Sequence, residues 1–240
     1  MSHNTKTAVM QPYFMPYIGY FQLICAVDTF VILDDVNFIM KGWINRNNIL
    51  LNGEKHLFTI PLEKSSQNKL ILDTKLNFSD KDKGILLKTL QTAYKRAPLF
   101  PCVYPLLEEI IMQEETDLTA FIMHSLKAVL AYLSIKKTIL KSSEIEKDMS
   151  LKGQNKIIEL CRKTNTQTYI NPIGGIELYK QSNFKNANME LKFVNTQFDN
   201  IVYKQFKNDF VNGLSFIDVL MFNPIPDIHY FLKQYKLIDN

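Results

Sequence analysis

The sequence predicts an α/β fold with a doubly wound, mostly parallel sheet, a β-hairpin and a helical insertion. Near the N-terminus, two apolar strand-like runs flank a short helical segment within about 30 residues, which is the pattern of a βαβ unit. A second alternation of strand-like and helical segments occupies residues 136–196. Between the two, residues 79–133 have a helical pattern throughout. These three observations favour a sheet that carries helices on both faces.

The first βαβ unit covers residues 7–35. Residues 7–11 (TAVMQ) are predicted to form a buried strand, and residues 18–27 place apolar side chains at the spacing of a short helix. Residues 28–35 (DTFVILDD) form an apolar run that ends in two carboxylates, as expected of a central parallel strand.

A β-hairpin is predicted at residues 50–60, because Asn52-Gly53 stands between two β-type runs. Residues 69–78 (KLILDTKLNF) are a further strand candidate.

The helical stretch begins at Ser79, where Ser and Asp side chains can cap a helix that ends before Pro98. We expect residues 79–133 to form a helical subdomain within a single α/β domain of residues 1–240. A lid, a dimer surface and a plain scaffold are all open roles for it. The expected helices cover residues 79–97, 105–115 and 116–135.

The second half of the predicted sheet follows this stretch. In chain order we expect a short strand and loop at 136–145, a helix at 151–165, a strand at 167–172, a loop and short helix at 173–187, a last strand at 189–196 and a helical segment at 212–224.

Composition limits the classes of function. The net charge of +4 suits an acidic small ligand such as a nucleotide, and simple solubility explains it as well, so we do not expect DNA binding. The cysteines are far apart and the histidines do not pair at ligand spacing, so neither a disulfide framework nor a metal site is expected. We find no signal peptide or membrane-spanning run and expect a cytoplasmic protein without membrane insertion. The residues concerned are Cys25, Cys102, Cys161, His3, His56, His124 and His229.

Three unusual segments follow predicted strands, where ligands bind in open parallel sheets. In the first, Pro12 and Pro16 fix the turn, and Gly19 permits a close backbone approach at the helix start. Its tyrosines could form a platform for a base or a sugar, or simply pack the top of the sheet. The candidate ligand-binding residues here are Gln11, Tyr13, Tyr17, Gly19 and Tyr20.

The second segment, DDVNFIMKGWINRN, is the densest polar cluster in the chain. Asp34 or Asp35 could face the crevice as a base or ribose partner, and Trp43 could stack on a ring. The alternative is a solvated loop with Asn-capped turns. Candidate groups for phosphate or carboxylate oxygens are Lys41, Asn45, Arg46 and Asn47.

The third segment, NPIGG, places Asn171 at a strand end and Gly174 and Gly175 just beyond it. The glycine amides could approach an anionic group, although an ordinary turn explains them nearly as well, and no GxGxxG fingerprint is present. Asp218, an acid within an apolar helical run, could be a cap, half of an ion pair or a site residue.

Four motifs in the chain together resemble the WbqC-like family. They are QPYFMPYIGYFQLI, DTFVILDDVNFIMKGWINRN, TYINPIGG and LSFIDVLMFN, in the family's order and across nearly the whole chain. The resemblance implies a role in bacterial biosynthesis of O-antigen, lipopolysaccharide and other surface polysaccharides. Some members are described as glycine transferases that act on the amino group of a nucleotide-linked aminodeoxysugar.

The first βαβ unit is also similar in layout to that of adenylyl-transferring enzymes, the nucleotidyltransferase or HUP-like arrangement. There an HxGH motif holds ATP phosphates at the helix start. The matching place here reads Tyr17-Ile18-Gly19-Tyr20, so the glycine is kept and both histidines are tyrosines. Because tyrosine cannot be a cationic phosphate ligand, this departure argues against direct adenylyl transfer.

Three functions are weighed. The first is an N-acyltransferase, aminoacyl in kind, that modifies a nucleotide-linked amino sugar such as a dTDP-sugar, with a thioester, an aminoacyl-tRNA or an ATP-derived adenylate as acyl donor. The second is a nucleotidyltransferase or ATP-dependent amide ligase, and the third a non-catalytic sugar-nucleotide binding module. No cofactor is certain, and a homodimer is open. For the first function, Asp34 or Asp35 would be the base, and the amide of Asn45, Asn47 or Asn171 would polarise the carbonyl. Lys41 and Arg46 would bind phosphate. The rings of Tyr13, Tyr17 and Trp43 would stack on the base or the sugar.

Overall fold

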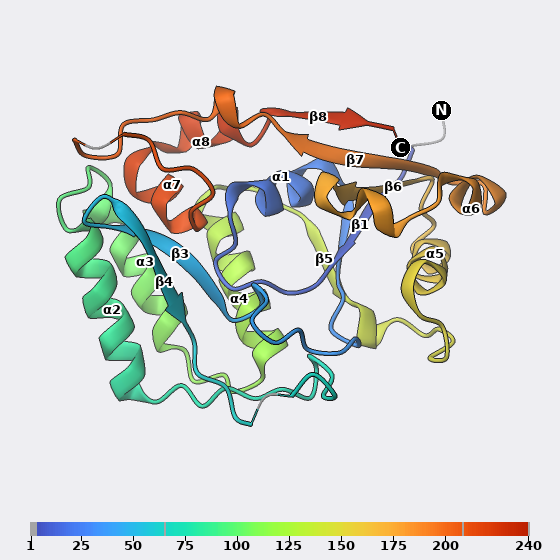
Figure 1. Cartoon of the computed structure of the whole chain (residues 1–240), viewed down its shortest axis with the longest axis horizontal. Helices are drawn as coiled ribbons and strands as arrows, with labels where there is room; N and C mark the ends of the chain where they lie inside the picture. Colours follow the sequence, from blue (N-terminus) through green and yellow to red (C-terminus); the bar gives the residue numbers. More distant parts are fainter. Residues whose placement is uncertain (1–3, 65, 208, 240) are drawn as a thin grey trace.

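The central element of the computed structural model is a six-stranded sheet with the strand order β5-β2-β1-β6-β7-β8 (Figure 1). Within this sheet β5, β2, β1, β6 and β7 run parallel, and β8 pairs antiparallel with β7 at the edge. The doubly wound α/β fold is therefore confirmed. The structure describes residues 4–64, 66–207 and 209–239, so His3 lies outside the described residues. The strands are β1 (Lys6–Met10), β2 (Thr29–Ile32), β5 (Thr138–Lys141), β6 (Thr168–Pro172), β7 (Glu190–Thr196) and β8 (Tyr235–Ile238).

Side chains alternate between the two faces of the sheet, as the two-residue repeat of a strand requires. Ala8 and Phe30 enter a large apolar cluster on one face, whereas Val9 and Val31 enter a smaller cluster on the other. The larger cluster is covered by α1 (Ile18–Ala26), α4 (Leu118–Tyr132), α7 (Phe216–Phe222) and α8 (Ile225–Phe231), and the smaller by α5 (Gly153–Lys163) and α6 (Gln181–Asn186).

The chain reverses its winding direction between β1 and β6. From β1 the order runs to β2 and β5 on one side, and from β6 to β7 on the other. The strands β1 and β2 pair through four residues each, but β1 and β6 pair only through Lys6–Thr7 and Thr168–Tyr169. The carboxyl ends of β1 and β6 are therefore not joined, and this is the point where doubly wound folds bind ligands.

The predicted hairpin is confirmed as β3 (Arg46–Leu51) and β4 (Glu54–Thr59), a separate two-stranded sheet. Asn52 and Gly53 both have positive φ values, 54° and 84°, as a type I′ turn requires. β3 packs against α7 and against α2 (Asp80–Tyr94).

The helical stretch contains α2, α3 (Phe100–Met112) and α4. Ser79 and Asp82 form a reciprocal capping box at the start of α2, as the Ser/Asp signal predicts. α3 begins earlier than expected and includes Pro105 in its interior. A second proline, Pro101, stands four residues before Pro105. It lies in the first turn of α3, where a proline is tolerated.

Two expectations for the remaining elements are wrong. Residues 69–78 form no strand, because the chain turns between Leu70 and Thr74, and its ends make isolated bridges to different partners. The strand at 190–196 is not the last one, since the short, largely exposed β8 follows it. No helix in the described part of the chain is long and apolar enough to cross a membrane.

Candidate functional site

A cavity of about 460 Å³ opens at the carboxyl ends of β1 and β6. This volume lies within the range of about 300–1,000 Å³ that small-molecule sites occupy. It collects residues from all three segments singled out in the sequence. The lining residues are Val9, Met10, Gln11, Tyr13, Tyr17, Tyr20, Leu33, Ile39, Asn171, Pro172, Gly174, Gly175, Leu178 and Tyr179.

The cavity wall formed by the first segment is held rigidly. The Tyr20 hydroxyl donates to the carbonyl of Gln11 at 2.8 Å, and the Tyr13 ring lies 5.5 Å from the Tyr20 ring. The turn itself is tied down at the carbonyl of Met15, which accepts from Nδ2 of Asn47 (2.8 Å) and from the Ser215 hydroxyl (2.7 Å). Asn47 therefore positions the tyrosine wall and does not line the cavity.

Tyr17 lies over the N-terminus of α1. A Cβ on Gly19 would come within 2.6 Å of the Tyr17 hydroxyl oxygen, so only glycine leaves room for this ring. The close approach predicted for Gly19 is thus made by the chain's own Tyr17. A phosphate at this helix start would require the ring to move.

The tyrosine hydroxyls of the cavity are hydrogen-bond donors at neutral pH. Burial raises the pKa of Tyr13, Tyr17 and Tyr20 above the ordinary value of 10.0. Tyr13 and Tyr17 are therefore suited to donate hydrogen bonds to a ligand's oxygens, whereas the Tyr20 hydroxyl already donates to the Gln11 carbonyl, and all three are poor bases.

Asn171 faces the tyrosine wall from the end of β6 and is only 4 % exposed. Its Oδ1 lies 3.4 Å from the Tyr169 hydroxyl, and its Nδ2 lies where a side chain on Gly175 would have to stand. Gly175 is therefore required by the close approach of Asn171. By contrast, a Cβ on Gly174 would meet nothing within 4 Å.

Asp35 is buried in a charged cluster and does not line the cavity. It forms ion pairs with Lys147 at 2.7 Å and Lys156 at 3.0 Å, and it accepts from the Ser142 hydroxyl at 2.7 Å. Burial raises the pKa of this carboxyl, but the hydrogen bonds from Lys147, Ser142 and Lys156 outweigh burial and leave the pKa below 3.8. A carboxylate held in this way stabilises the loop after β5.

Asp34 likewise lies outside the cavity lining. It is buried and accepts from the amide (2.9 Å) and the hydroxyl (2.6 Å) of Ser143. Burial raises the pKa of Asp34. The base role expected of Asp34 or Asp35 stays a prediction, and neither carboxylate stands beside the tyrosine wall.

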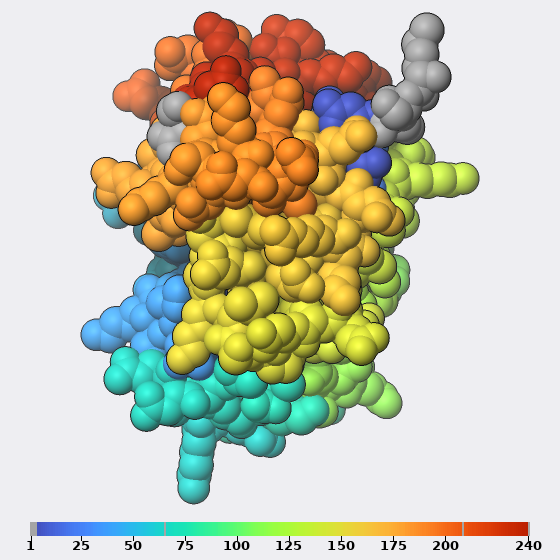
Figure 2. Space-filling view, turned by 90° about the vertical axis from the view of Figure 1, so that its right-hand side faces the viewer, coloured from blue at the N-terminus to red at the C-terminus, as the bar shows by residue number. Residues whose placement is uncertain are grey.

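The polar loop 36–47 contributes one apolar residue, Ile39, to the cavity mouth. Figure 2 shows the light-blue segment around residue 40 projecting below the orange segment, with a hollow between them. The other candidates of this loop do not line the cavity. Lys41 and Trp43 are exposed, Arg46 donates to the carbonyl of Gly42 and lies 5.8 Å from the Trp43 ring, and Asn45 donates to the carbonyl of Ile60.

Tyr179 and Leu178 line the cavity but were not among the residues singled out in the sequence. The Tyr179 hydroxyl lies 3.2 Å from that of Tyr169, and the Tyr169 ring stacks on Phe184 at 5.2 Å. The only sequence signal for them is their place just after the two glycines. Among the described residues, no group of three or more His, Cys, Asp or Glu side chains could hold a metal ion.

The fold and this cavity define an α/β protein with a tyrosine-lined cavity at the switch point of its sheet. The chain belongs to the WbqC-like protein family, whose sequence profile matches residues 11–230. An uncharacterized protein of Mycobacterium tuberculosis, Rv1507c, is 27% identical over 237 residues, which cover 95% of this chain and 99% of that protein. No solved structure matches the chain.

Proposed function

We propose that the protein is an N-acyltransferase, aminoacyl in kind, that modifies the amino group of a nucleotide-linked aminodeoxysugar in surface-polysaccharide biosynthesis. The observation that carries the proposal is the tyrosine-lined cavity at the switch point, with the Asn171 amide on its wall. Membership of the WbqC-like family supports the substrate class. A substrate of this class places the protein in the cytoplasm, where such sugar nucleotides are made.

The cavity suits a neutral, hydroxyl-rich ring. Tyrosine faces pack against the apolar faces of sugars and bases, and their hydroxyls hydrogen-bond sugar oxygens. No Asp, Glu, Lys, Arg or His is among the described residues that line the cavity. Recognition there therefore depends on shape and neutral hydrogen bonds, and the diphosphate would extend out of the mouth past Ile39.

The same absence of charge limits the chemistry. In the proposed step, the sugar amine attacks the acyl carbonyl, a C–N bond forms, and the bond from the carbonyl carbon to the leaving group breaks with its electron pair. The amine's protons pass to solvent, because none of the described lining residues is a carboxylate or an imidazole. Nδ2 of Asn171 would donate to the developing oxyanion. The protein then contributes positioning, and the donor must arrive activated.

The test is to incubate the purified chain with UDP- and dTDP-amino sugars and with glycyl thioester, glycyl-tRNA or glycyl adenylate, and to detect glycylation by mass spectrometry. We expect product with at least one donor. Replacing Asn171 by Ala should lower kcat by about 10²-fold or more. Gly175→Ala should act in the same direction because it displaces Asn171, whereas Gly174→Ala is the matched control. If no donor leaves the sugar amine modified, the acyltransferase proposal is wrong.

One observation favours a second candidate, a binding module without turnover: the described cavity residues include no general base. Calorimetry separates the two functions. A binder would take up the amino-sugar nucleotide and lose affinity in Asn171→Ala, with no product from any donor. The ligase alternative loses support because Tyr17 covers the helix start where ATP phosphates would sit.

A further inference from the structure

We propose that a second cavity, remote from the carboxyl ends of β1 and β6, binds a ligand through clustered phosphate groups. Its volume is about 760 Å³, and it lies between the hairpin turn, the C-terminal end of α2 and the loop after β7. This proposal does not depend on the acyltransferase function. We call it the basic cavity, after the side chains that line it: Lys95, Arg96, Lys204 and Lys207.

The positive charge of the basic cavity is not compensated. All four side chains belong to exposed residues, and no ion pair to any of them is found among the described residues. No Asp or Glu is among the described lining residues; the neighbouring acids in the sequence, Glu54 and Asp209, lie outside the lining. Lys95 and Arg96 also offset the dipole of α2, but Lys204 and Lys207 come from another segment and have no such role.

Apolar residues form the floor beneath these cations. Leu50 of β3 and Ala93 of α2 are buried there. Phe206, which stands between Lys204 and Lys207 in the sequence, is half-buried and also lines the cavity. Phe206 packs edge-on against Phe222 at 4.8 Å. An apolar floor with a cationic rim suits phosphates whose attached group can pack against carbon.

A buried carboxylate joins the three walls of the basic cavity. Asp218, which is 0 % exposed, accepts from the Tyr94 hydroxyl at the end of α2 (3.0 Å) and from the Tyr203 hydroxyl of the loop (2.6 Å). It also accepts from Nε2 of Gln205 (2.5 Å). Tyr94 in turn accepts from the amide of Leu50 in the hairpin (2.9 Å). Hairpin, helix and loop are thus joined through Leu50 of the lining and through Tyr94 and Tyr203, the residues that precede Lys95 and Lys204.

Two hydrogen bonds and one unusual backbone dihedral characterise the described residues of the loop after β7. The Gln205 side chain bonds both the amide (2.7 Å) and the carbonyl (3.1 Å) of Val211. Phe206 has a φ of 52°, which a bulky residue rarely adopts. Such conformations persist where the surroundings impose them, often at ligand sites. These restraints act at Gln205 and Phe206, on the backbone between Lys204 and Lys207.

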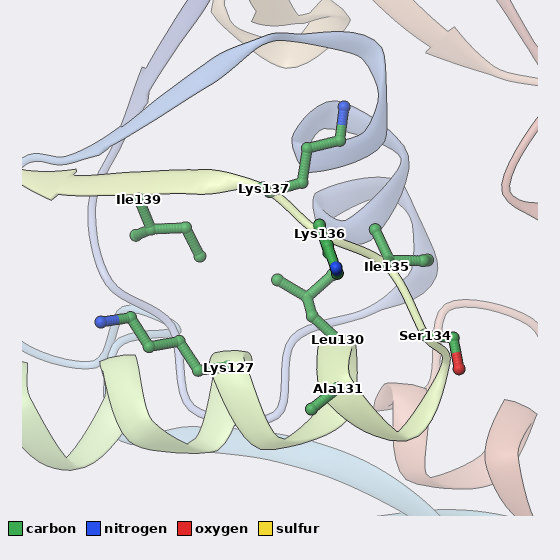
Figure 3. Close-up of a pocket in the computed structure, with 8 residues that line it drawn as sticks. All are labelled: Lys127, Leu130, Ala131, Ser134, Ile135, Lys136, Lys137 and Ile139. Atoms are coloured by element: carbon green, nitrogen blue, oxygen red, sulfur yellow. The ribbon is translucent and has the colours of Figure 1, made fainter.

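A second lysine-lined cavity serves as a comparison for the basic cavity. A cavity of about 510 Å³ lies between α4 and β5, and Figure 3 shows its lining residues Lys127, Lys136 and Lys137. There Lys137 points to α1 and donates to the carbonyls of Cys25 (2.9 Å) and Val27 (2.6 Å), so it caps that helix. Its remaining two lysines provide a matched control.

The test measures binding of tripolyphosphate, ATP and a short single-stranded RNA to the full-length chain, by calorimetry and fluorescence anisotropy at two salt concentrations. We expect at least one probe to bind, and Lys204→Ala/Lys207→Ala to weaken its affinity by at least about tenfold, which corresponds to about 1.4 kcal/mol. The variant should also show a shallower salt dependence. Lys127→Ala/Lys136→Ala makes the same change in net charge and should bind as the wild type does.

Each outcome decides the proposal. Binding of tripolyphosphate or ATP identifies a free phosphate compound as the source, and binding of RNA alone identifies a nucleic acid; both support the site. Equal losses in the two double variants would show diffuse attraction by net charge and overturn it. So would the absence of binding by all three probes at low salt. Thermal melting checks that the variants, all at exposed positions, remain folded.

Discussion

Two buried carboxylates, Asp35 at the end of β2 and Asp218 in α7, fix loops in opposite ways. Asp35 is neutralised by two lysine ammonium groups, whereas Asp218 receives hydrogen bonds from two tyrosine hydroxyls and a glutamine amide. The hydrogen bonds from the lysines leave the pKa of Asp35 lowered, and burial leaves the pKa of Asp218 raised. A buried acid is thus no guide to a catalytic base until its donors are known.

The largest effect is expected for Asp35→Asn. It leaves Lys147 and Lys156 buried without a counter-charge, and removing one partner of a buried ion pair costs about 3–5 kcal/mol. Urea unfolding at pH 7 measures the loss. The neighbouring Asp34→Asn is the control and should cost less than about 1 kcal/mol, because an amide can keep the bonds to Ser143. Equal losses would contradict a special role for the lysines.

A smaller loss of about 1–3 kcal/mol is expected for Asp218→Asn, because the new NH₂ group faces donors and leaves at least one of them unpaired. The variant should also weaken phosphate binding at the basic cavity, since the three walls lose their common anchor. Unfolding and probe binding measured on the same preparation test both effects. A loss larger than that of Asp35→Asn would reverse the comparison.

The two variants should respond to pH with opposite sign. The folded pKa of Asp35 is lowered, so its contribution is present above the ordinary value of 3.8 and is lost as pH falls through the folded value. The deficit of Asp35→Asn should therefore shrink below about pH 4. The folded pKa of Asp218 is raised, so the wild type loses stability as pH rises from 3.8 through the folded pKa. The stability deficit of Asp218→Asn relative to the wild type should therefore become smaller as pH rises. Unfolding curves between pH 3 and 7 show whether the signs differ.

The smallest effects are expected for the tyrosines around Asp218. Tyr203→Phe removes one donor and should cost about 0.5–1.5 kcal/mol. Tyr94→Phe should cost more, because it also leaves the buried amide of Leu50 without its acceptor. Denaturation midpoints at constant m-value give the ranking. A larger loss for Tyr203→Phe than for Tyr94→Phe would contradict the part assigned to Leu50.

Much of the cavity at the sheet could be predicted because strand ends converge by topology. Tyr13 and Asn171 lie far apart in the sequence, but each follows a parallel strand, and neighbouring parallel strands end at the same edge. No such topological rule predicts that Lys147 and Lys156 pair with Asp35, because this pairing depends on the three-dimensional path of the loop after β5. The sequence pattern therefore predicts Asp34 or Asp35 at the crevice, whereas contacts with Ser142 and Ser143, which the pattern does not encode, bury both carboxylates.

The same limit applies to secondary structure and charge. Asn52-Gly53 predicts its hairpin because the turn chemistry is local. Residues 69–78 have strand-like composition, yet Leu70 and Leu76 bridge to separate partners, which composition does not encode. Likewise, Lys95 and Lys204 belong to segments with no local signal that connects them.

The cluster around Asp35 has a consequence for how the chain acquires its structure. Asp35 lies 107 residues before Ser142 and 121 before Lys156, and all of the helical stretch is synthesised between them. Contacts between such distant segments form after the local ones, because closing a long loop costs entropy first. While the polypeptide is leaving the ribosome, this carboxylate emerges well before its lysines. The bonds that join β2 to the loop after β5 are therefore expected late in folding, with φ-values near zero.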